Sequence, residues 1–431
     1  MALPYFIFVY LFNLCLVTSA QTTYNNITLG SSLVAGDNSL WLSPSNDFAF
    51  GFQQIQSGSF LLALWFNKIP EKTITWSANR DQLAPKGSKV ELTSDGNLIL
   101  TDPSGRELWK PKQQQTVAAA AAVLDTGNFI LIDKNSVVVW QSFDEPTDTL
   151  LPTQNLNQGS QLIASFTSKN YSSGRFSFDI NYNGNVALYT TNFPLFNSLN
   201  SIYQTFEDQG LGYQVVFSKS GSLNLVDGSG DVLADVLQNE VSHEEIQYQR
   251  VILEYDGVLR HYIYPKNSSP SKNWFINSFS PDNICTAVTQ QTGSGVCGFN
   301  SYCKLGNDMK PKCICPPGYA VLDSTNEMSG CFQNFPAQSC NAASTEKDKF
   351  DFKVLQDVDW PLSDYEHFEN VSIEWCKEVC LNDCFCAVAI YRNGGDCWKK
   401  KTPLSNGKND SSVDRIAFIK TRINGGSNHG H

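Results

Sequence analysis

The sequence predicts a mainly β protein in which two tandem three-fold β units precede two small cysteine-rich modules. Short alternating or β-branched stretches, separated by turns rich in Gly, Pro and Asn, fill residues 24–265. A turn followed by a strand recurs along that stretch, which indicates one supersecondary unit used several times. Apart from Cys15, every one of the 13 cysteines lies beyond residue 280.

Length and charge narrow the class of protein. A chain of 431 residues predicts roughly two to four domains. The net charge of −11 disfavours nucleic acid and anionic lipid surfaces as partners. Charged residues make up only 17% and aromatic residues 12%, which favours folded β domains over disorder.

The N-terminus predicts export. Residues 1–20 contain the apolar run Leu3–Val17 followed by Thr18–Ala20, small residues suited to signal cleavage. Asn13 interrupts the run, which is shorter than the ~20 apolar residues of a membrane span, so we expect a cleaved signal and no membrane span. Five N-glycosylation sequons agree with a secreted or cell-surface protein: Asn26, Asn170, Asn267, Asn370 and Asn409.

The first β unit is expected over residues 21–152. Phe48–Phe52 alternates and Leu61–Phe66 is apolar, as expected of strands. Ser94-Asp-Gly-Asn-Leu-Ile-Leu recurs as Leu124-Asp-Thr-Gly-Asn-Phe-Ile-Leu, and each copy is followed by a second turn and a strand that ends in Trp. The recurrence predicts equivalent turn-and-strand units around a shared core.

The stretch Trp140–Pro152 marks a junction, because a β-branched run ends there in Trp140 and prolines and turn formers follow. The pattern of a turn followed by a strand then recurs three times, beginning at Asn183, Ser220 and Asp256. Residues 153–280 are therefore predicted to form a second, diverged β unit.

Two cysteine clusters follow, and each predicts a disulfide framework, because a module this short cannot bury enough core unaided. The first contains Cys285, Cys297, Cys303, Cys313, Cys315 and Cys331, for which 15 pairings are open. The second contains Cys340, Cys376, Cys380, Cys384, Cys386 and Cys397. Ser372 is placed to cap a helix that presents Cys376 and Cys380 on one face. Zinc could occupy such a cluster, but no His is interleaved and an exported chain meets oxidising conditions, so disulfides are favoured and no metal is expected.

No pattern indicates an enzyme. Gly293–Gly298 matches G-x-G-x-x-G but lies inside a cysteine module without a strand–helix context. Protein-kinase motifs do not occur. His243, His261 and His367 have no neighbouring nucleophile motif, and the pair Glu244–Glu245 gives no opposed carboxylates. We expect neither catalysis nor a cofactor.

Binding remains. The Asp-x-Asn turn and its strand place a carboxylate, an amide and a further side chain two residues apart, on one face. These groups can hold sugar hydroxyls. The alternative is a tight turn without a ligand, and for any single copy that alternative is favoured.

Together the modules resemble the ectodomain of a plant G-type (bulb-type) lectin S-receptor-like serine/threonine-protein kinase. The resemblance rests on Trp76-Ser-Ala-Asn-Arg-Asp81, Asp95-Gly-Asn-Leu, Asp125-Thr-Gly-Asn, Trp140–Pro152 and the cysteine spacings. It implies a β-prism lectin domain at 21–152, a second lectin-like S-locus-type domain at 153–280, an EGF-like module at 281–334, a PAN/apple module at 335–422 and a flexible tail at 423–431. In this family a membrane helix and a kinase follow, whereas this chain ends after the PAN module, as a fragment, a truncated product or a secreted relative would.

The resemblance also implies specific pairs and sites. The EGF-like module implies Cys285–Cys303, Cys297–Cys313 and Cys315–Cys331. The PAN module implies Cys376–Cys397 and Cys380–Cys386, which leaves Cys340–Cys384. Calcium is not expected, because the acid or amide that calcium-binding EGF modules carry before the first cysteine is missing at Ile284.

Bulb lectins that hold mannose use Gln-x-Asp-x-Asn-x-Val-x-Tyr. The first-unit copy gives Thr93, Asp95, Asn97, Ile99 and Thr101, and the second-unit copy gives Asn181, Asn183, Asn185, Ala187 and Tyr189. The candidate carbohydrate-binding residues are therefore Thr93, Asp95, Asn97, Thr101, Asn183, Asn185 and Tyr189, although neither copy is complete.

The expected function is recognition of a glycan or another extracellular ligand, without catalysis, by a protein that pairs as a receptor ectodomain with itself or with a related chain. The alternative is a structural or decoy protein that has lost sugar binding and acts through protein contacts.

Overall fold

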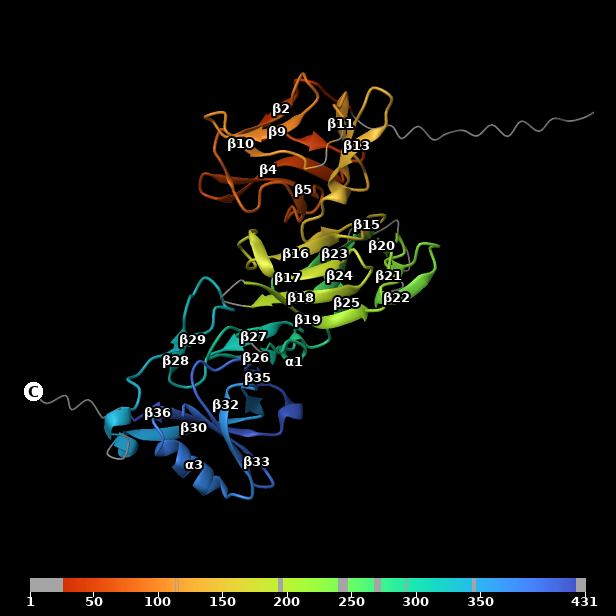
Figure 1. Ribbon diagram of the computed structural model, residues 1–431. Helices are drawn as coiled ribbons and strands as arrows, with labels where there is room; N and C mark the ends of the chain where they lie inside the picture. Colours follow the sequence, from red (N-terminus) through yellow and green to blue (C-terminus); the bar gives the residue numbers. More distant parts are fainter. Residues whose placement is uncertain are drawn as a thin grey trace, which may run out of the picture.

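The computed structural model describes residues 26–112, 114, 116–192, 197–238, 247–266, 273–290, 293–342 and 346–423. The molecule is elongated, with the first β unit at one end, the second in the middle and the cysteine-rich modules at the other end (Figure 1). The predictions for the signal at 1–20, for His243, Glu244–Glu245 and Asn267, and for the tail beyond Ile423 lie outside the described residues.

The first β unit is a prism of three antiparallel sheets. One sheet has the order β1 (Ile27–Thr28), β11 (Ala120–Val123), β12 (Phe129–Ile132), β13 (Val138–Gln141). The next has the order β10 (Glu107–Trp109), β9 (Leu98–Thr101), β8 (Lys89–Leu92), β2 (Ser32–Val34). The third has the order β3 (Trp41–Leu42), β4 (Phe48–Gln56), β5 (Ser59–Phe66), β6 (Ile74–Ser77), with β7 (Ala84–Pro85) also paired to β5.

Three tryptophans occupy the centre of this prism. The rings of Trp76, Trp109 and Trp140 pack edge to face, with centroids 5.7–6.0 Å apart. Glu145 follows the short 3-10 turn η1 (Ser142–Asp144) and binds two of them: its carbonyl accepts from Trp76 Nε1 at 2.7 Å and its carboxylate from Trp140 Nε1 at 2.9 Å. The predicted junction therefore closes the first core at the point where the chain leaves it.

The second unit repeats the prism. Its first sheet is β14 (Thr149–Leu150), β23 (Gln247–Leu253), β24 (Leu259–Pro265), β25 (Phe275–Ser280). Its second is β15 (Asn155–Asn157), β20 (Gln214–Phe217), β21 (Leu223–Val226), β22 (Val232–Leu237). Its third is β16 (Ser160–Ser165), β17 (Ser173–Ile180), β18 (Val186–Asn192), β19 (Asn197–Glu207). Leucine, valine and phenylalanine side chains fill its core, and no described tryptophan lies among its buried residues.

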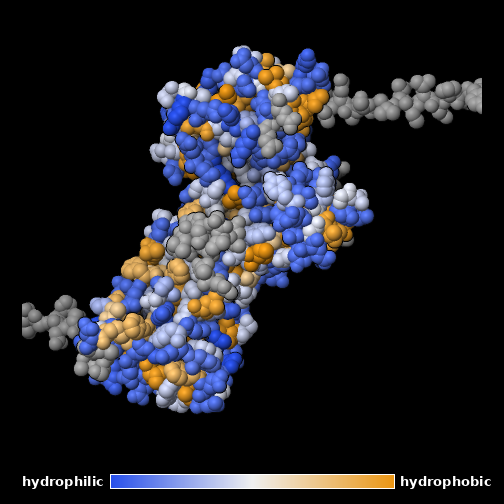
Figure 2. All heavy atoms as spheres, in the orientation of Figure 1, coloured by the Kyte–Doolittle hydropathy of each residue, from blue (hydrophilic) through white to orange (hydrophobic). Residues whose placement is uncertain are grey.

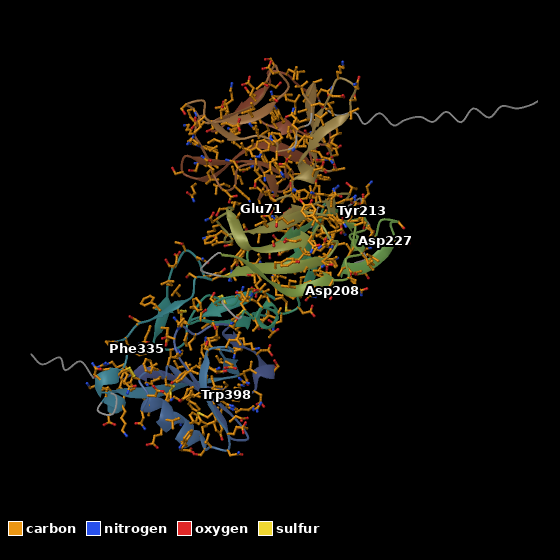
Figure 3. All side chains as sticks on the ribbon, in the orientation of Figure 1. Glu71, Asp208, Tyr213, Asp227, Phe335 and Trp398 are labelled. Atoms are coloured by element: carbon orange, nitrogen blue, oxygen red, sulfur yellow. A yellow bond between two sulfur atoms is a disulfide. The ribbon has the colours of Figure 1, made fainter. Side chains whose placement is uncertain are left out.

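Residues of the Trp76–Asp81 motif join the prisms. Arg80 Nη1 donates to the carbonyl of Ile163 at 2.8 Å, and Asp81 accepts from the amide of Ser173 at 2.6 Å. The molecule narrows where the prisms meet (Figure 2), and Glu71 of the first prism lies at that boundary (Figure 3). The two units therefore contact each other through specific polar groups as well as through aromatic packing, since Tyr248 and Trp274 of the second prism lie 5.1 and 5.3 Å from Phe66 by ring centroid.

The cysteine-rich modules contain six disulfides: Cys285–Cys303, Cys297–Cys313, Cys315–Cys331, Cys340–Cys384, Cys376–Cys397 and Cys380–Cys386. These are the pairs that the resemblance implies, and disulfides fit an extracellular protein.

The elements of the first cysteine module are α1 (Ile284–Ala287), β26 (Tyr302–Leu305), β27 (Pro311–Ile314), β28 (Tyr319–Val321) and β29 (Cys331–Gln333). The described buried residues of this module join the cores of its neighbours. Cys285, Cys297 and Cys303 are buried with the core of the second prism, whereas Tyr302 and Tyr319 are buried with residues of the last module. The first cysteine module thus links its two neighbours.

The last module is a five-stranded sheet crossed by one helix. Its sheet has the order β30 (Phe350–Gln356), β36 (Ile416–Arg422), β33 (Val388–Arg392), β34 (Asp396–Lys400), β32 (Asp364–Phe368). Two further strands, β31 (Val358–Asp359) and β35 (Lys408–Asn409), pair with each other, and β35 extends the β26–β27 sheet. Short 3-10 turns are η3 (Cys340–Ala342), η4 (Lys347–Lys349) and η5 (Ser411–Val413).

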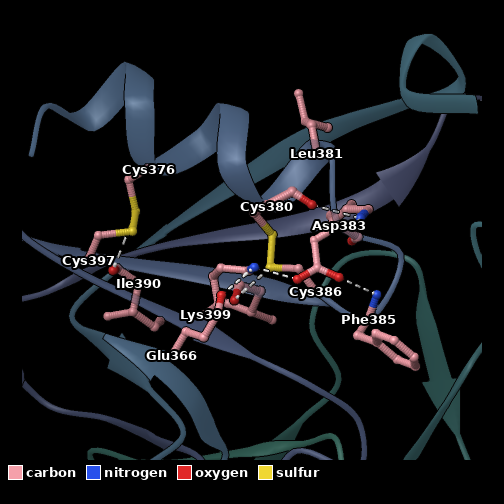
Figure 4. Close-up of a disulfide and its surroundings, with 12 residues drawn as sticks. Glu366, Cys376, Cys380, Leu381, Asp383, Phe385, Cys386, Ile390, Cys397 and Lys399 are labelled. Atoms are coloured by element: carbon pink, nitrogen blue, oxygen red, sulfur yellow. Dashed lines mark hydrogen bonds and ion pairs between the residues drawn. A yellow bond between two sulfur atoms is a disulfide. The ribbon is translucent and has the colours of Figure 1, made fainter. Parts of the chain in front are cut away.

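The predicted helix is α3 (Ile373–Leu381), and Ser372 Oγ accepts from the amide of Trp375 at 3.2 Å as its N-cap. Figure 4 shows how Cys376 and Cys380 point from one face of α3 to their disulfide partners.

The mainly β class, with two prisms and disulfide-rich modules, is confirmed. In the described part of the chain, no helix has the length and apolarity that crossing a bilayer requires.

Candidate carbohydrate-binding faces

The first predicted copy lies in the turn from β8 to β9. Thr93 Oγ1 accepts from the amide of Asn97 at 3.1 Å, and Gly96 takes the positive φ of 77° that the turn requires. Asp95 and Asn97 are exposed at the tip. The turn is therefore stabilised by its own backbone and by Thr93, and its carboxylate points to solvent.

The remaining positions of this copy, Ile99 and Thr101, lie on the outer face of β9, because Leu98 and Leu100 are buried. Lys89 and Glu91 on the neighbouring strand β8 form an ion pair of 2.5 Å beside them. This face thus has a closed ion pair next to an isoleucine.

The side chains of the second copy in the first prism, Asp125 and Asn128, form hydrogen bonds with other residues of that prism. Asp125 accepts from the amide and the hydroxyl of Ser45 at 2.9 and 2.6 Å. Asn128 is buried, its Oδ1 accepts from Ser142 Oγ at 3.1 Å, and its Nδ2 donates to Gln141 Oε1 at 2.8 Å. At this copy the alternative of a structural turn accounts for the hydrogen bonds of Asp125 Oδ1 and of the Asn128 amide.

The copy in the second prism, in contrast, places two of its side chains on an outer face of the sheet. Asn181 Oδ1 accepts from the amides of Asn183 and Asn185 at 2.9 and 3.0 Å, which fixes the turn from β17 to β18. Asn185 and Tyr189 then lie on one outer face with Ala187 between them, because Val186 and Leu188 point into the core. Asn183 is exposed at the end of that face. The structure therefore brings Asn185 and Tyr189 together and leaves Asn183 at the tip.

Sequence reasoning missed two residues of this face. Asp179 on β17 pairs with Ala187 on β18, so its side chain lies beside Asn185 and Tyr189, and Thr191 continues the face along β18. Asp179 Oδ1, Asn185 Oδ1 and Thr191 Oγ1 are buried, and none has a hydrogen-bond partner. The hairpin register could have indicated Asp179, because a turn at 181–185 pairs residue 179 with residue 187. We call Asp179, Asn185, Tyr189 and Thr191 the β17–β18 face.

The environment of this face favours neutral forms. Burial raises the pKa of Asp179 to about 6, although a hydrogen bond with Ser177 opposes the shift. Burial, and then the charge of Asp179, raises the pKa of Tyr189. A carboxyl, an amide and a hydroxyl with vacant acceptor positions are suited to hold the hydroxyl groups of a ligand.

The two described histidines, His261 and His367, have structural contacts. His261 is fully buried beside Gln249, at 3.1 Å, and burial lowers its pKa to about 4. His367 stacks on Trp398 with ring centroids 4.7 Å apart and lies 3.3 Å from Asp396. His367, Asp396 and Glu369 are close enough to share a cation, but Asp396 is already paired with Arg392.

The glycine motif at 293–298 serves packing. Arg175 of the second prism donates to the carbonyl of Gly295 at 2.8 Å, and a Cβ on Gly298 would lie 2.5 Å from the amide nitrogen of Gly330. Gly295 therefore contacts the second prism, and Gly298 allows a close approach within the first cysteine module.

The sequons fall into two groups. Asn26, Asn170 and Asn370 are exposed. Asn409 lies in β35, where its Nδ2 donates to the carbonyls of Gln356 and Asp357 at 3.0 and 3.1 Å. Its amide nitrogen is thus engaged in the fold.

Comparison with known proteins gives one family match, to D-mannose binding lectin, over residues 73–172. G-type lectin S-receptor-like serine/threonine-protein kinase LECRK1 of Oryza sativa subsp. indica is 40% identical over 424 residues, which cover 94% of this chain and 52% of that protein. LECRK4 of Oryza sativa subsp. japonica is 41% identical over 425 residues, with 94% and 52% covered. The kinase RLK1 of Arabidopsis thaliana is 34% identical over 432 residues, with 94% and 51% covered.

Among solved structures, a lectin of Marasmius oreades matches with a TM-score of 0.23 and 17% identity over 31% of this chain and 91% of the other. A monomeric monocot mannose-binding lectin from Gastrodia elata matches with a TM-score of 0.22 and 19% identity, over 27% of this chain and 94% of the other.

Over 94% of its length the chain matches G-type lectin S-receptor-like serine/threonine-protein kinases, which confirms the resemblance seen in its sequence. It spans about half the length of the curated relatives it matches.

Proposed function

We propose that this chain is the extracellular glycan-recognition region of a receptor-like kinase or of a secreted relative, and that the β17–β18 face of the second prism is its carbohydrate-binding site. The observation that carries the proposal is the row of three buried, unpartnered oxygens at Asp179, Asn185 and Thr191. Each unsatisfied buried acceptor costs about 1–3 kcal/mol, so a ligand that donates hydrogen bonds would bind there with a large gain.

Sugar hydroxyls are such donors, and the chemistry of the face suits them. The Tyr189 side chain adds a phenol and an apolar ring surface beside the acceptors. The name of the matching family model, D-mannose binding lectin, makes mannose the first sugar to test. The outer face of β9 is a weaker candidate, because the Lys89–Glu91 ion pair satisfies both of its charged groups.

The test is a calorimetric titration of the chain from Gln21 to His431 with mannose and mannose-rich oligosaccharides, after enzymatic trimming of its own N-glycans. Two double variants are compared: Asp179→Asn/Asn185→Ala on the β17–β18 face, and Asp95→Ala/Asn97→Ala in the first prism as the matched control. We expect saturable binding that the first variant loses and the second retains.

Two outcomes would contradict the proposal. Loss of binding in the Asp95→Ala/Asn97→Ala variant alone would move the site to the first prism. No binding by the unaltered chain would favour the alternative of a structural or decoy protein, for which sedimentation velocity would report association with itself or with a related ectodomain.

A further inference from the structure

A second binding feature lies between the prisms, away from the β17–β18 face. A cavity of about 450 Å³ opens where the turns of the first prism face β23 and the turn at Lys219 of the second. Its volume lies in the range of pockets that bind small ligands. We call it the inter-prism cleft and define it by Asp47, Asp125, Lys219, Gln247 and Tyr248.

The floor of the inter-prism cleft is aromatic. Phe48 and Phe66 of the first prism lie 4.7 Å apart by ring centroid, and Tyr248 of the second prism packs 5.1 Å from Phe66. All three are buried. Gly127 allows the first-prism wall to approach this floor, because a Cβ there would lie 2.7 Å from the Phe48 ring. The floor is therefore rigid and formed by both prisms.

Most charged groups of the cleft are already paired. Asp47 contacts Lys68 at 2.7 Å and Lys266 at 3.6 Å. Hydrogen bonds from Ser45 outweigh the opposing effect of burial and hold the pKa of Asp125 below its ordinary value, so Asp125 is an ionised acceptor.

Two groups of the second-prism wall have no partner among the described side chains. Gln247 Oε1 is buried without a hydrogen-bond partner. Lys219 is exposed, and no ion pair involves it among the described residues. Its backbone is nevertheless fixed, because its carbonyl accepts from Gln249 Nε2 at 3.0 Å. The cleft therefore presents one vacant acceptor and one unpaired ammonium above an aromatic floor.

We infer that the inter-prism cleft binds a short acidic oligosaccharide, that is, sugar rings that carry a carboxylate. The hydroxyl groups would donate to Gln247 Oε1 and Asp125, the apolar ring faces would lie over the aromatic floor, and the carboxylate would pair with Lys219. A neutral sugar leaves Lys219 unpaired, and a lipid tail leaves Gln247 Oε1 unsatisfied. The inference goes beyond the proposed function, since it concerns a different site and a different sugar class.

The probe is the trimer of α-1,4-linked galacturonic acid, titrated calorimetrically into the glycan-trimmed chain. The test variants are Lys219→Gln and the double variant Lys219→Gln/Gln247→Leu, both outside the cores. Lys134→Gln, on an exposed turn of the first prism, is the matched control. We expect saturable binding that weakens at higher salt, falls about tenfold or more in the double variant and is unchanged in Lys134→Gln.

Binding of the trimer by the Asp179→Asn/Asn185→Ala variant separates the two sites, so that failure of one proposal leaves the other standing. The inference is overturned if the unaltered chain does not bind the trimer, or if the double variant, with an unchanged melting temperature, binds it as well as the unaltered chain does. It is also overturned if neutral mannotriose competes with the trimer and loses affinity in Lys219→Gln, because the cleft would then not select for charge.

Discussion

The two prisms share one architecture but use equivalent turn residues in opposite ways. In the first prism, Asn128 makes hydrogen bonds through both atoms of its amide, and Asp125 is held by Ser45. In the second, Asn185 at the position equivalent to Asn128 leaves a buried oxygen without a partner, and so does Asp179 on strand β17 before the turn. Turns that look alike in sequence thus stabilise the fold in one prism and leave vacant acceptors in the other.

The cores differ as well. The first prism is centred on the Trp76, Trp109 and Trp140 rings. The second has an aliphatic and phenylalanine core, and at its edge the fully buried Arg260 pairs with Asp256 at 2.8 Å and with Glu254. The first unit is therefore held mainly by aromatic packing, and the second adds buried charge pairs that depend on both partners.

The largest expected effect concerns the tryptophan centre. Trp140→Ala should destabilise the first prism by about 3–5 kcal/mol, because a large cavity forms and the hydrogen bond to Glu145 is lost. Differential scanning calorimetry measures the change as a lower first transition, and Trp375→Ala, at a half-exposed ring on α3, is the control. An unchanged thermogram for Trp140→Ala would mean that the three rings are not the centre of the first unit.

The next prediction compares how the contributions of Asp179 and Asp125 to stability change with pH. The pKa of Asp179 is raised from 3.8 to about 6, so its contribution to stability is present below about pH 4 and is lost as pH rises through 6. Asp179→Asn should therefore stabilise the chain at pH 7.5, by up to roughly 3 kcal/mol, and have little effect at pH 4.

Asp125 should behave in the opposite way. Its pKa is lowered, so its contribution is present at neutral pH and is lost as pH falls through the folded-state pKa. Asp125→Asn should destabilise the chain at pH 7.5. Urea unfolding at both pH values measures both variants, and the same sign of change for the two at pH 7.5 would show that the contrast between the prisms is wrong.

Much of the fold could be predicted from local sequence. The Asp-Gly-Asn and Asp-Thr-Gly-Asn stretches form the expected turns, and the alternation after them gives strands such as β9. The helix that begins after Ser372 and the mainly β class were also predicted, because capping and periodicity are properties of neighbouring residues.

Long-range pairing could not be predicted in this way. The parallel contact of β26 with β35 joins residues about a hundred positions apart, so nothing near Cys303 indicates that Lys408 lies beside it. For the same reason the sequence does not distinguish Asn128 from Asn185: the partners of Asn128 are supplied by Gln141 and Ser142, beyond the next turn. Asp179 and Thr191 were missed because their role depends on strand register and burial rather than on the motif.

A smaller effect tests the contrast between the two asparagines directly. Asn128→Ala should destabilise the chain by about 1–3 kcal/mol, because Ser142 and Gln141 lose their partner in a buried site. Asn185→Ala should change stability by less than about 0.5 kcal/mol, since its Oδ1 has no partner to lose. Urea denaturation of the two variants without ligand gives both values, and equal losses would show that Asn185 is structural after all.

The smallest expected effect concerns glycosylation, and it again distinguishes asparagines whose amides are hydrogen-bonded within the fold from exposed ones. A glycan attached to an asparagine replaces one hydrogen of its Nδ2, so an amide nitrogen that donates both hydrogens within the fold is a poor acceptor site. Asn26, Asn170 and Asn370 are exposed, whereas Asn409 Nδ2 donates to two carbonyls of the strand end at Gln356 and Asp357. Glycopeptide mass spectrometry of the secreted chain should therefore find glycans at the three exposed sites and none at Asn409. Full occupancy at Asn409 would mean that the glycan is added before β35 pairs with β31, and that this pairing tolerates the loss of both hydrogen bonds.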